Sequence, residues 1–273
     1  MSNPSLGADN RGGGPVRPGR VAALAARLGL VICLCLPRIT AHAETTQLLV
    51  GVHQNMHAVL IAPDGPGPYP GILLLHTSGG LKSADLDYAQ QLAKLGYVTL
   101  VPSFLDAYGI TARSRRETFL DDAQPIYADL VAALQTLQQQ PKVAGRKLGA
   151  IGFSNGGYFA MWLAATGKVQ AGVSYYGALS GAGTDRNLDH FHDIFTHDSS
   201  PVLILHGTDD DTVPARAAQH LDALLEAAGS PHELKLYEGA GHQFERMPGV
   251  AADDAAAADA WQRTQAFFAR YLN

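Results

Sequence analysis

Short apolar runs alternate with amphipathic segments along most of the chain. The run GILLLH, residues 71–76, is apolar at every position except the last. Such a short continuous run is typical of a strand buried on both faces of a sheet. Other short runs are rich in β-branched residues or alternate in polarity. The pattern predicts strands at residues 46–52, 57–63, 71–76, 97–102, 147–153, 169–177, 201–207 and 232–239.

Longer segments with helical spacing lie between these runs. From residue 83 onward, one helical stripe consists of Leu86, Ala89, Leu92 and Leu95. Ser83 is a preferred N-terminal capping residue and Gly96 a preferred residue after a last turn, so we expect this helix to run between them. Comparable patterns predict helices from Pro125 onward and at residues 156–167, 212–229 and 253–273.

The regular alternation of strand and helix predicts a single α/β domain over residues 44–273. We expect a mostly parallel central sheet with helices on both faces. In that architecture ligands bind in the crevice at the carboxyl ends of the strands. Functional residues should therefore lie in loops that follow strands.

The first 43 residues have a different pattern. Arginines precede the apolar run LGLVICLCL, residues 28–36, and Ala41 and Ala43 have the spacing of a cleavage site. The apolar run is too short for a membrane span. We interpret the segment as a secretory signal peptide removed before Glu44, which predicts a secreted or periplasmic protein. The alternative is an N-terminal anchor helix that stays attached.

The distribution of cysteine and charge narrows the function. Both cysteines, Cys33 and Cys35, lie in the N-terminal segment, so the domain has neither a disulfide nor a thiol nucleophile. That segment also holds five arginines against one aspartate, which leaves the domain more acidic than the whole chain, whose net charge is −5. An acidic surface argues against nucleic acid and anionic membranes. We expect a small-molecule substrate, no cofactor and no stable membrane insertion after processing; the sequence indicates no oligomeric state.

The motif GFSNGG, residues 152–157, joins a predicted strand to a predicted helix. A G-x-S-x-G turn in this place presents a serine nucleophile, and its glycines keep strand and helix clear of each other. The motif alone is weak evidence, because a glycine-rich connection has the same composition. In this context Ser154 is the candidate nucleophile. The amide of Asn155, at the helix N-terminus, is a candidate oxyanion donor.

A nucleophilic serine needs a general base and a carboxylate that orients the base. His242 follows the last predicted strand in the loop GAGHQF and is the best candidate base. The loop GTDDDTVP, after the preceding strand, offers three aspartates at positions 209–211, and the residues alone do not select one. His76 and His206 each end a strand, and we expect structural or supporting roles for both. The chain order Ser, Asp, His is that of α/β-hydrolases.

Together these motifs resemble the dienelactone hydrolase family of the α/β-hydrolase fold, from about Thr46 to the C-terminus. The resemblance assigns the acid to Asp210, three residues after the glycine of GTDDDTVP. It also implies that Arg246, four residues after His242, contacts the substrate. Dienelactone hydrolases proper use a cysteine nucleophile and carry a glutamate where this chain has Thr77. The chain therefore resembles a serine-nucleophile, esterase-like branch, and the family name does not identify the substrate.

The loop HTSGG, after the run at residues 71–76, is the expected source of the second oxyanion donor. By family position this donor is the amide of Ser78, with Thr77 as the next choice. Thr77 and Tyr108 join Arg246 as candidates for contact with the substrate. The alternative is a glycine loop that only lets strand and helix pack.

Two polar insertions, residues 103–122 and 177–200, are expected to cover the site. The first carries Tyr108 and several arginines, of which Arg113 is one candidate to bind an acidic substrate; a solvated loop is the alternative. The second holds His190, His192 and His197 among aspartates. A metal site is the alternative to a solvated lid there, and we predict no catalytic metal.

The combined pattern predicts an exported serine hydrolase that cleaves a carboxylic ester or lactone through an acyl-enzyme. Ser154, His242 and Asp210 are the predicted triad. Two alternatives remain: a small oligopeptidase-like serine peptidase, and a non-catalytic accessory protein that retains the fold.

Overall fold

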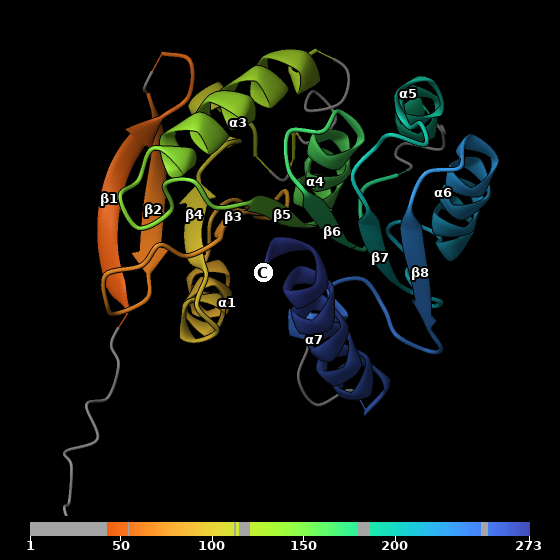
Figure 1. Ribbon diagram of the computed structural model, residues 1–273. Helices are drawn as coiled ribbons and strands as arrows, with labels where there is room; N and C mark the ends of the chain where they lie inside the picture. Colours follow the sequence, from red (N-terminus) through yellow and green to blue (C-terminus); the bar gives the residue numbers. More distant parts are fainter. Residues whose placement is uncertain (1–42, 54, 112, 115–120, 180–185, 247–250) are drawn as a thin grey trace, which may run out of the picture. The chain divides into compact units, whose positions relative to one another are not determined.

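The strands form one eight-stranded sheet, in the order β1-β2-β4-β3-β5-β6-β7-β8 (Figure 1). This computed structural model describes residues 43–53, 55–111, 113–114, 121–179, 186–246 and 251–273. These described residues belong to one compact unit. The strands are β1 (Glu44–Val50), β2 (Met56–Ala62), β3 (Gly71–Leu75), β4 (Val98–Pro102), β5 (Leu148–Phe153), β6 (Ala171–Tyr175), β7 (Val202–Gly207) and β8 (His232–Tyr237).

The sheet is mostly parallel, as predicted. Strand β2 pairs antiparallel with β1 and β4, and every other neighbouring pair is parallel. Each strand lies within or close to a predicted apolar run. The carboxyl ends of β3, β5, β6, β7 and β8 therefore meet at one edge of the sheet, where the candidate site residues follow them.

Two hydrophobic cores lie on the two faces of the sheet. Leu73 and Leu75 of β3 belong to one core, whereas Ile72 and Leu74 belong to the other. This is why the strand is apolar at successive positions. The helices of the first side are α3 (Ala123–Gln138), α4 (Asn155–Ala165), α5 (Arg186–Ile194) and α6 (Ala215–Ala228). The helices of the second side are α1 (Ser83–Lys94) and α7 (Ala251–Leu272) (Figure 1).

Helix α1 differs from expectation at both ends. Its N-cap is Lys82 rather than Ser83, and the Asp85 carboxylate accepts the Lys82 N–H at 2.8 Å. Leu95, predicted on the buried stripe, is the C-cap residue and is 44% exposed, so its place on the stripe was wrong. Gly96 ends the helix as predicted, with a φ of 90° that other residues rarely adopt.

Parts of both insertions pack into the core. In the first, η1 (Asp106–Tyr108) is a short 3-10 turn, and the buried side chains around it are Phe104, Leu105 and Ile110. In the second, the sequence did not predict helix α5, whose Leu188 and Phe191 are buried in the core beside α4. A solvated lid was therefore the wrong interpretation for this part of residues 177–200. Polar residues lie between the few apolar positions of α5, so its helical pattern is weak in the sequence.

The C-terminal helix α7 lies directly on the strand that leads to Ser154. A Cβ atom on Gly149 of β5 would come within 2.8 Å of Leu272 and 3.0 Å of Phe268. Just before β5, the Lys147 ammonium donates to the carbonyl oxygen of Tyr271 at 2.9 Å. Among the described residues, no helix combines the length and apolarity needed to cross a membrane.

The start of α4 touches two strands without room for a side chain. A Cβ atom on Gly156 would lie 2.1 Å from the carbonyl oxygen of Leu75 in β3. A Cβ atom on Gly152 would lie 2.0 Å from the carbonyl oxygen of Gly156. Real Cβ atoms do not approach backbone so closely, so both positions require glycine.

We therefore expect Gly156→Ala to lower the free energy of unfolding by about 2 to 4 kcal/mol, because α4 must move away from β3 to admit the methyl group. Chemical denaturation measures the change. Gly241→Ala is the control, since no atom lies within 4 Å of a Cβ atom there. Equal midpoints for the two variants would contradict the argument.

Candidate active site

Ser154 occupies a sharp turn between β5 and α4. Its backbone has φ 53° and ψ −112°, a combination that residues other than glycine rarely adopt. The turn is held by neighbouring backbone: the Ser154 N–H donates to Tyr175 at 3.0 Å, and its carbonyl oxygen accepts the N–H of Ala178 at 3.0 Å. Local strain of this kind is typical of a turn that lifts a nucleophile out of a sheet.

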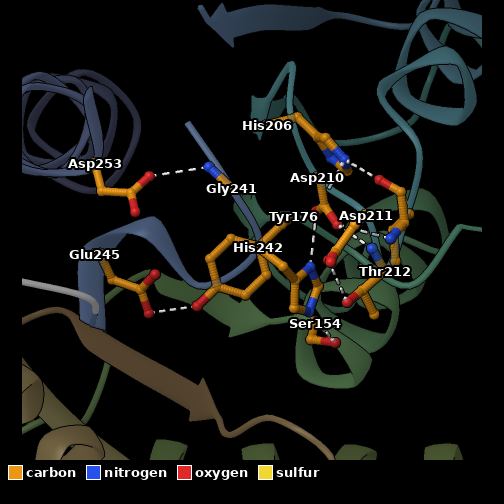
Figure 2. Close-up of polar contacts among 11 residues, drawn as sticks. Ser154, Tyr176, His206, Asp210, Asp211, Thr212, Gly241, His242, Glu245 and Asp253 are labelled. Atoms are coloured by element: carbon orange, nitrogen blue, oxygen red, sulfur yellow. Dashed lines mark hydrogen bonds and ion pairs between the residues drawn. The ribbon is translucent and has the colours of Figure 1, made fainter. Parts of the chain in front are cut away.

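The structure brings Ser154, His242 and Asp210 into one hydrogen-bonded line (Figure 2). The His242 Nδ1 lies 2.7 Å from Asp210 Oδ2, and its Nε2 lies 3.3 Å from Ser154 Oγ. A proton on Nδ1 donates to the carboxylate and leaves the Nε2 lone pair free to accept the serine hydroxyl. The longer contact is common in free enzymes and shortens when substrate binds.

The structure distinguishes the three adjacent aspartates. Asp210 is buried, and its Oδ1 accepts the N–H groups of Thr212 at 2.9 Å and Val213 at 2.7 Å. Asp209 and Asp211 are exposed and accept only neighbouring threonine hydroxyls in the described structure. Burial alone would raise the pKa of Asp210, but the hydrogen bond and charge of His242 and the Val213 amide outweigh it. The pKa is lowered, which keeps the carboxylate charged.

His206 lies beside this carboxylate, fully buried. Its Nε2 is 2.8 Å from the carbonyl oxygen of Val213 and 3.3 Å from Asp210 Oδ2. Burial lowers the pKa of His206 despite the opposing effects of Val213 and Asp210. A neutral imidazole with its proton on Nε2 donates to the Val213 carbonyl oxygen and lies next to the carboxylate. This geometry agrees with the supporting role expected for His206.

His76 is also buried, at the end of β3. Its Nδ1 donates to the carbonyl oxygen of Thr77 at 2.7 Å, and its ring stacks on Phe104 with centroids 4.4 Å apart. Burial lowers the pKa of His76, so the ring is held neutral. Its contacts are those of a structural histidine, as expected.

The loop after β3 forms a tight turn next to the start of α4. The Thr77 hydroxyl accepts the N–H of Gly79 at 3.2 Å, and the Thr77 carbonyl oxygen accepts that of Gly80 at 3.1 Å. Ser78 lies half-buried in this turn. Asn155 is the first residue of α4, where a backbone N–H has no partner within the helix. The end of β3, which leads into this turn, contacts Gly156 in the first turn of α4. The amides of Ser78 and Asn155 remain predicted oxyanion donors.

Comparison with known proteins assigns the chain to a family. The sequence model of the dienelactone hydrolase family matches residues 56–272. The chain belongs to the dienelactone hydrolase family. It is accordingly a hydrolase of the carboxylic ester or lactone type. The α/β-hydrolase fold and the resemblance seen in the sequence are both confirmed.

Named relatives support this membership. A protein from Methylorubrum extorquens, named as a carboxymethylenebutenolidase, is 31% identical over 77% of this chain and 75% of its own length. A Bradyrhizobium protein, named as a 2-oxo-3-(5-oxofuran-2-ylidene)propanoate lactonase, is 27% identical over 79% of this chain and 89% of its own length. A Klebsiella pneumoniae crystal structure described as a dienelactone hydrolase is 26% identical and has a TM-score of 0.72, covering 85% of this chain and 99% of its own.

Tyr108 and Arg113, two further candidates for contact with the substrate, have other surroundings in the structure. The Tyr108 hydroxyl donates to Asp129 of α3 at 2.8 Å, and Asp129 also accepts the N–H of Val52 at 2.7 Å. None of the described contacts of Tyr108 reaches the triad. Arg113 is exposed. Arg115 and Arg116, which the sequence placed in the same insertion, lie outside the described residues.

Arg246 is also occupied in this dienelactone hydrolase family member. Its Nη2 lies 2.5 Å from Asp85 Oδ1, and its Nε lies 2.7 Å from Glu245 Oε1. The guanidinium stands over the Phe153 ring, 4.7 Å from the centroid. Only 14% of the side chain is exposed. The contact with substrate implied by the family resemblance would compete with two carboxylates that already bind this cation.

The histidines of the second insertion lie apart. His190 packs edge-on against Trp162, with centroids 4.2 Å apart, whereas His192 and His197 are exposed and each pair with the next aspartate. In the described part of the chain, no group of three or more His, Cys, Asp or Glu side chains is placed to hold a metal ion.

Sequence reasoning missed two residues next to the predicted triad. Tyr176, which follows β6, has a φ of 37° and places its ring 4.7 Å from that of His242. Its hydroxyl donates to Glu245, which follows His242 in the chain (Figure 2). Burial raises the pKa of Glu245, although Arg246 and the Tyr176 hydroxyl act against this. No sequence pattern relates positions 176 and 245, because only the fold brings them together.

The buried histidines predict how stability depends on pH. His76, His190 and His206 have pKa values lowered by burial, so the unfolded chain binds protons first as the pH falls. Their contribution is present above the unfolded pKa of about 6.5 and is lost below it. We expect the free energy of unfolding to fall between pH 7 and pH 5, by up to about 1.4 kcal/mol per pH unit for each of the fully buried His76 and His206, and by less for the half-buried His190.

His206→Gln tests this, because glutamine keeps a side-chain N–H donor and does not titrate. Urea unfolding at pH 7, 6 and 5 should give a shallower dependence on pH than in the wild type. His192→Gln, at an exposed position, is the matched control and should leave the slope unchanged. A His206→Gln slope equal to that of the wild type would count against the assignment.

Proposed function

We propose that this member of the dienelactone hydrolase family cleaves a carboxylic ester or lactone with Ser154 as its nucleophile. The observation that carries the proposal is the line of contacts from Ser154 Oγ to His242 at 3.3 Å and from His242 to Asp210 at 2.7 Å. The strained backbone of Ser154 and the glycine contacts of α4 support it, because they are the means by which such a turn presents a nucleophile.

In the proposed acylation step, Ser154 Oγ attacks the substrate carbonyl carbon while His242 Nε2 takes the hydroxyl proton. The carbonyl π electrons move to oxygen, and the amides of Asn155 and Ser78 stabilise the resulting oxyanion. Asp210 stabilises the imidazolium. When the tetrahedral intermediate collapses, the carbon–oxygen bond to the alcohol breaks, and His242 returns the proton to the leaving oxygen.

Deacylation repeats these steps with water as the nucleophile. His242 removes a proton from water, the hydroxide attacks the acyl-enzyme, and Ser154 leaves with the proton returned by His242. With an open-chain ester the alcohol departs before this step. With a lactone the alcohol stays joined to the acyl group, so the product is a hydroxy acid. The lactonase name of the Bradyrhizobium relative supports including lactones in the proposal.

Removal of any triad member should abolish most of the activity. We expect Ser154→Ala and His242→Gln to lower kcat/KM on p-nitrophenyl acetate by at least about 10⁴-fold, and Asp210→Asn by about 10³-fold to 10⁴-fold. Ser83→Ala, at the exposed start of α1, is the control and should match the wild type. Full activity in Ser154→Ala would exclude this nucleophile.

A fluorophosphonate probe and an amide substrate separate the remaining alternatives. A serine hydrolase should be labelled at Ser154, found by peptide mass spectrometry, whereas a non-catalytic accessory protein should not react. A serine peptidase should also cleave matched p-nitroanilides at rates comparable to those for the esters. We expect labelling with ester cleavage far exceeding amide cleavage.

We further propose that the domain is exported and that cleavage occurs after Ala43. The support is the order of arginines, apolar run and small residues in the sequence. Expression of the full chain in a Gram-negative host should yield a periplasmic protein. Its intact mass should equal that of a chain beginning at Glu44. Substituting Arg for Ala41 and Ala43 together should block processing. A mature protein that retains residues 1–43 would favour the anchor alternative.

A further inference from the structure

Beyond the triad, a chain of buried polar contacts joins His242 to helix α1. Its members are Tyr176, the adjacent pair Glu245 and Arg246, and Asp85, which come from three separate parts of the sequence. The proposed reaction assigns none of them a role. The question is what such a costly arrangement of charges does beside a catalytic histidine.

Tyr176 is held from three directions. Its N–H donates to the carbonyl oxygen of Leu205 at 2.7 Å, its hydroxyl donates to Glu245, and its ring lies 4.7 Å from that of His242 at an angle of 59°. The residue is fully buried and has a φ of 37°, in the left-handed region. This backbone conformation is unfavourable for a tyrosine. The contacts therefore hold the Tyr176 ring in a fixed position beside the imidazole (Figure 2).

Glu245 connects Tyr176 to the rest of the fold. Its Oε1 accepts both the Tyr176 hydroxyl and the Arg246 Nε, the latter at 2.7 Å. Arg246 extends the connection to Asp85, at 2.5 Å, and Asp85 accepts the Lys82 N–H at the start of α1. The segment that follows His242 is therefore tied to α1 by a cation shared between two carboxylates.

The imidazole of His242 needs such a support. It follows Gly239, Ala240 and Gly241. Ala240 is fully buried and the Gly241 N–H donates to Asp253 at 2.9 Å, so the backbone that leads to the ring is anchored and the orientation of the ring itself is what still has to be fixed. Its hydrogen bond to Asp210 fixes Nδ1 but permits the ring to rotate about that bond. Rotation would carry Nε2 away from Ser154, and a misplacement of about 1 Å at a reacting atom can cost about 100-fold in rate. The Tyr176 ring blocks this rotation on one side.

We propose that Glu245 is a positioning residue that, by holding Tyr176 against the imidazole, keeps His242 Nε2 directed at Ser154. This inference rests on the proposed function of the triad. Glu245 acts through Tyr176 and does not touch the substrate or the reacting atoms. The alternative is that the contacts only stabilise the fold, in which case their removal lowers the melting temperature and leaves turnover unchanged.

Three variants test the role by turnover of p-nitrophenyl acetate. Tyr176→Phe removes one hydroxyl, and we expect kcat to fall about 10-fold with KM within about twofold of the wild type. Glu245→Leu removes the acceptor, and kcat should fall about 100-fold. Glu245→Gln keeps the Oε1 acceptor, and kcat should stay within about threefold of the wild type. Rescue by glutamine distinguishes positioning by a hydrogen bond from a requirement for charge.

Tyr127→Phe is the matched control, because it also removes a tyrosine hydroxyl with a side-chain partner, Thr166 at 2.6 Å. It should leave kcat unchanged even if it lowers the melting temperature as much as Tyr176→Phe. In a double-mutant cycle, adding Tyr176→Phe to Glu245→Leu should cause little further loss, because both changes act on one contact. Independent, multiplicative losses would overturn the shared pathway.

A drop in kcat for Tyr176→Phe no larger than that of Tyr127→Phe would overturn the inference. If Glu245→Leu fails to fold, Tyr176→Phe alone tests the positioning role, because Tyr176→Phe removes only the hydroxyl oxygen. The wild type provides the separate check on the proposed function. If it neither hydrolyses the ester nor reacts with a fluorophosphonate, the triad assignment fails; if it does both while the variants match it, only the positioning role fails.

Discussion

The contact between the first turn of α4 and the ends of β3 and β5 is the constraint on which the site depends. Carbonyl oxygens stand where Gly152 and Gly156 would otherwise carry side chains. The helix can approach the sheet this closely only at glycine, and the approach forces Ser154 into its unusual backbone conformation. The same approach brings the loop that holds Ser78 to the helix N-terminus. One steric constraint thus links Ser154, the proposed nucleophile, to the predicted oxyanion donors.

The remaining polar groups are arranged around the imidazole of His242. Asp210 supplies its hydrogen-bond acceptor and is itself fixed by two backbone amides. His206 is buried beside that carboxylate with a lowered pKa, and it donates to the Val213 carbonyl oxygen without adding a second cation. The Tyr176 ring lies 4.7 Å from the ring of His242. A low-dielectric site of this kind favours a carboxylate paired with a single developing cation.

Much of the fold could be read from the sequence because parallel strands buried on both faces appear as short apolar runs. Ser154 and His242 could be placed because each follows such a run in a glycine-rich loop. Asp210 could not be separated from its two neighbours by pattern alone; the distinction is made by amide hydrogen bonds that depend on the loop conformation. Helix α5 was missed because polar residues interrupt its few apolar positions.

The polar contacts behind the site lay beyond sequence reasoning for a different reason. Asp85 and Arg246 are 161 positions apart, and Tyr176 and Glu245 are 69 apart. Nothing local in either pair differs from ordinary surface charge or core tyrosine. Arg246 shows the converse: its family position suggested a free cation for a ligand, whereas two acidic side chains of the same chain already neutralise it.

The packing of α7 on β5 bears on how the protein can be handled. Leu272 and Phe268 fill the space over Gly149, and Lys147 binds the carbonyl oxygen of Tyr271. The last residues are therefore part of the packing against β5, the strand that leads to Ser154. An affinity tag or fusion partner attached after Asn273 would begin directly beside these contacts. A linker placed there should be long and flexible enough that the added domain does not displace α7 from β5.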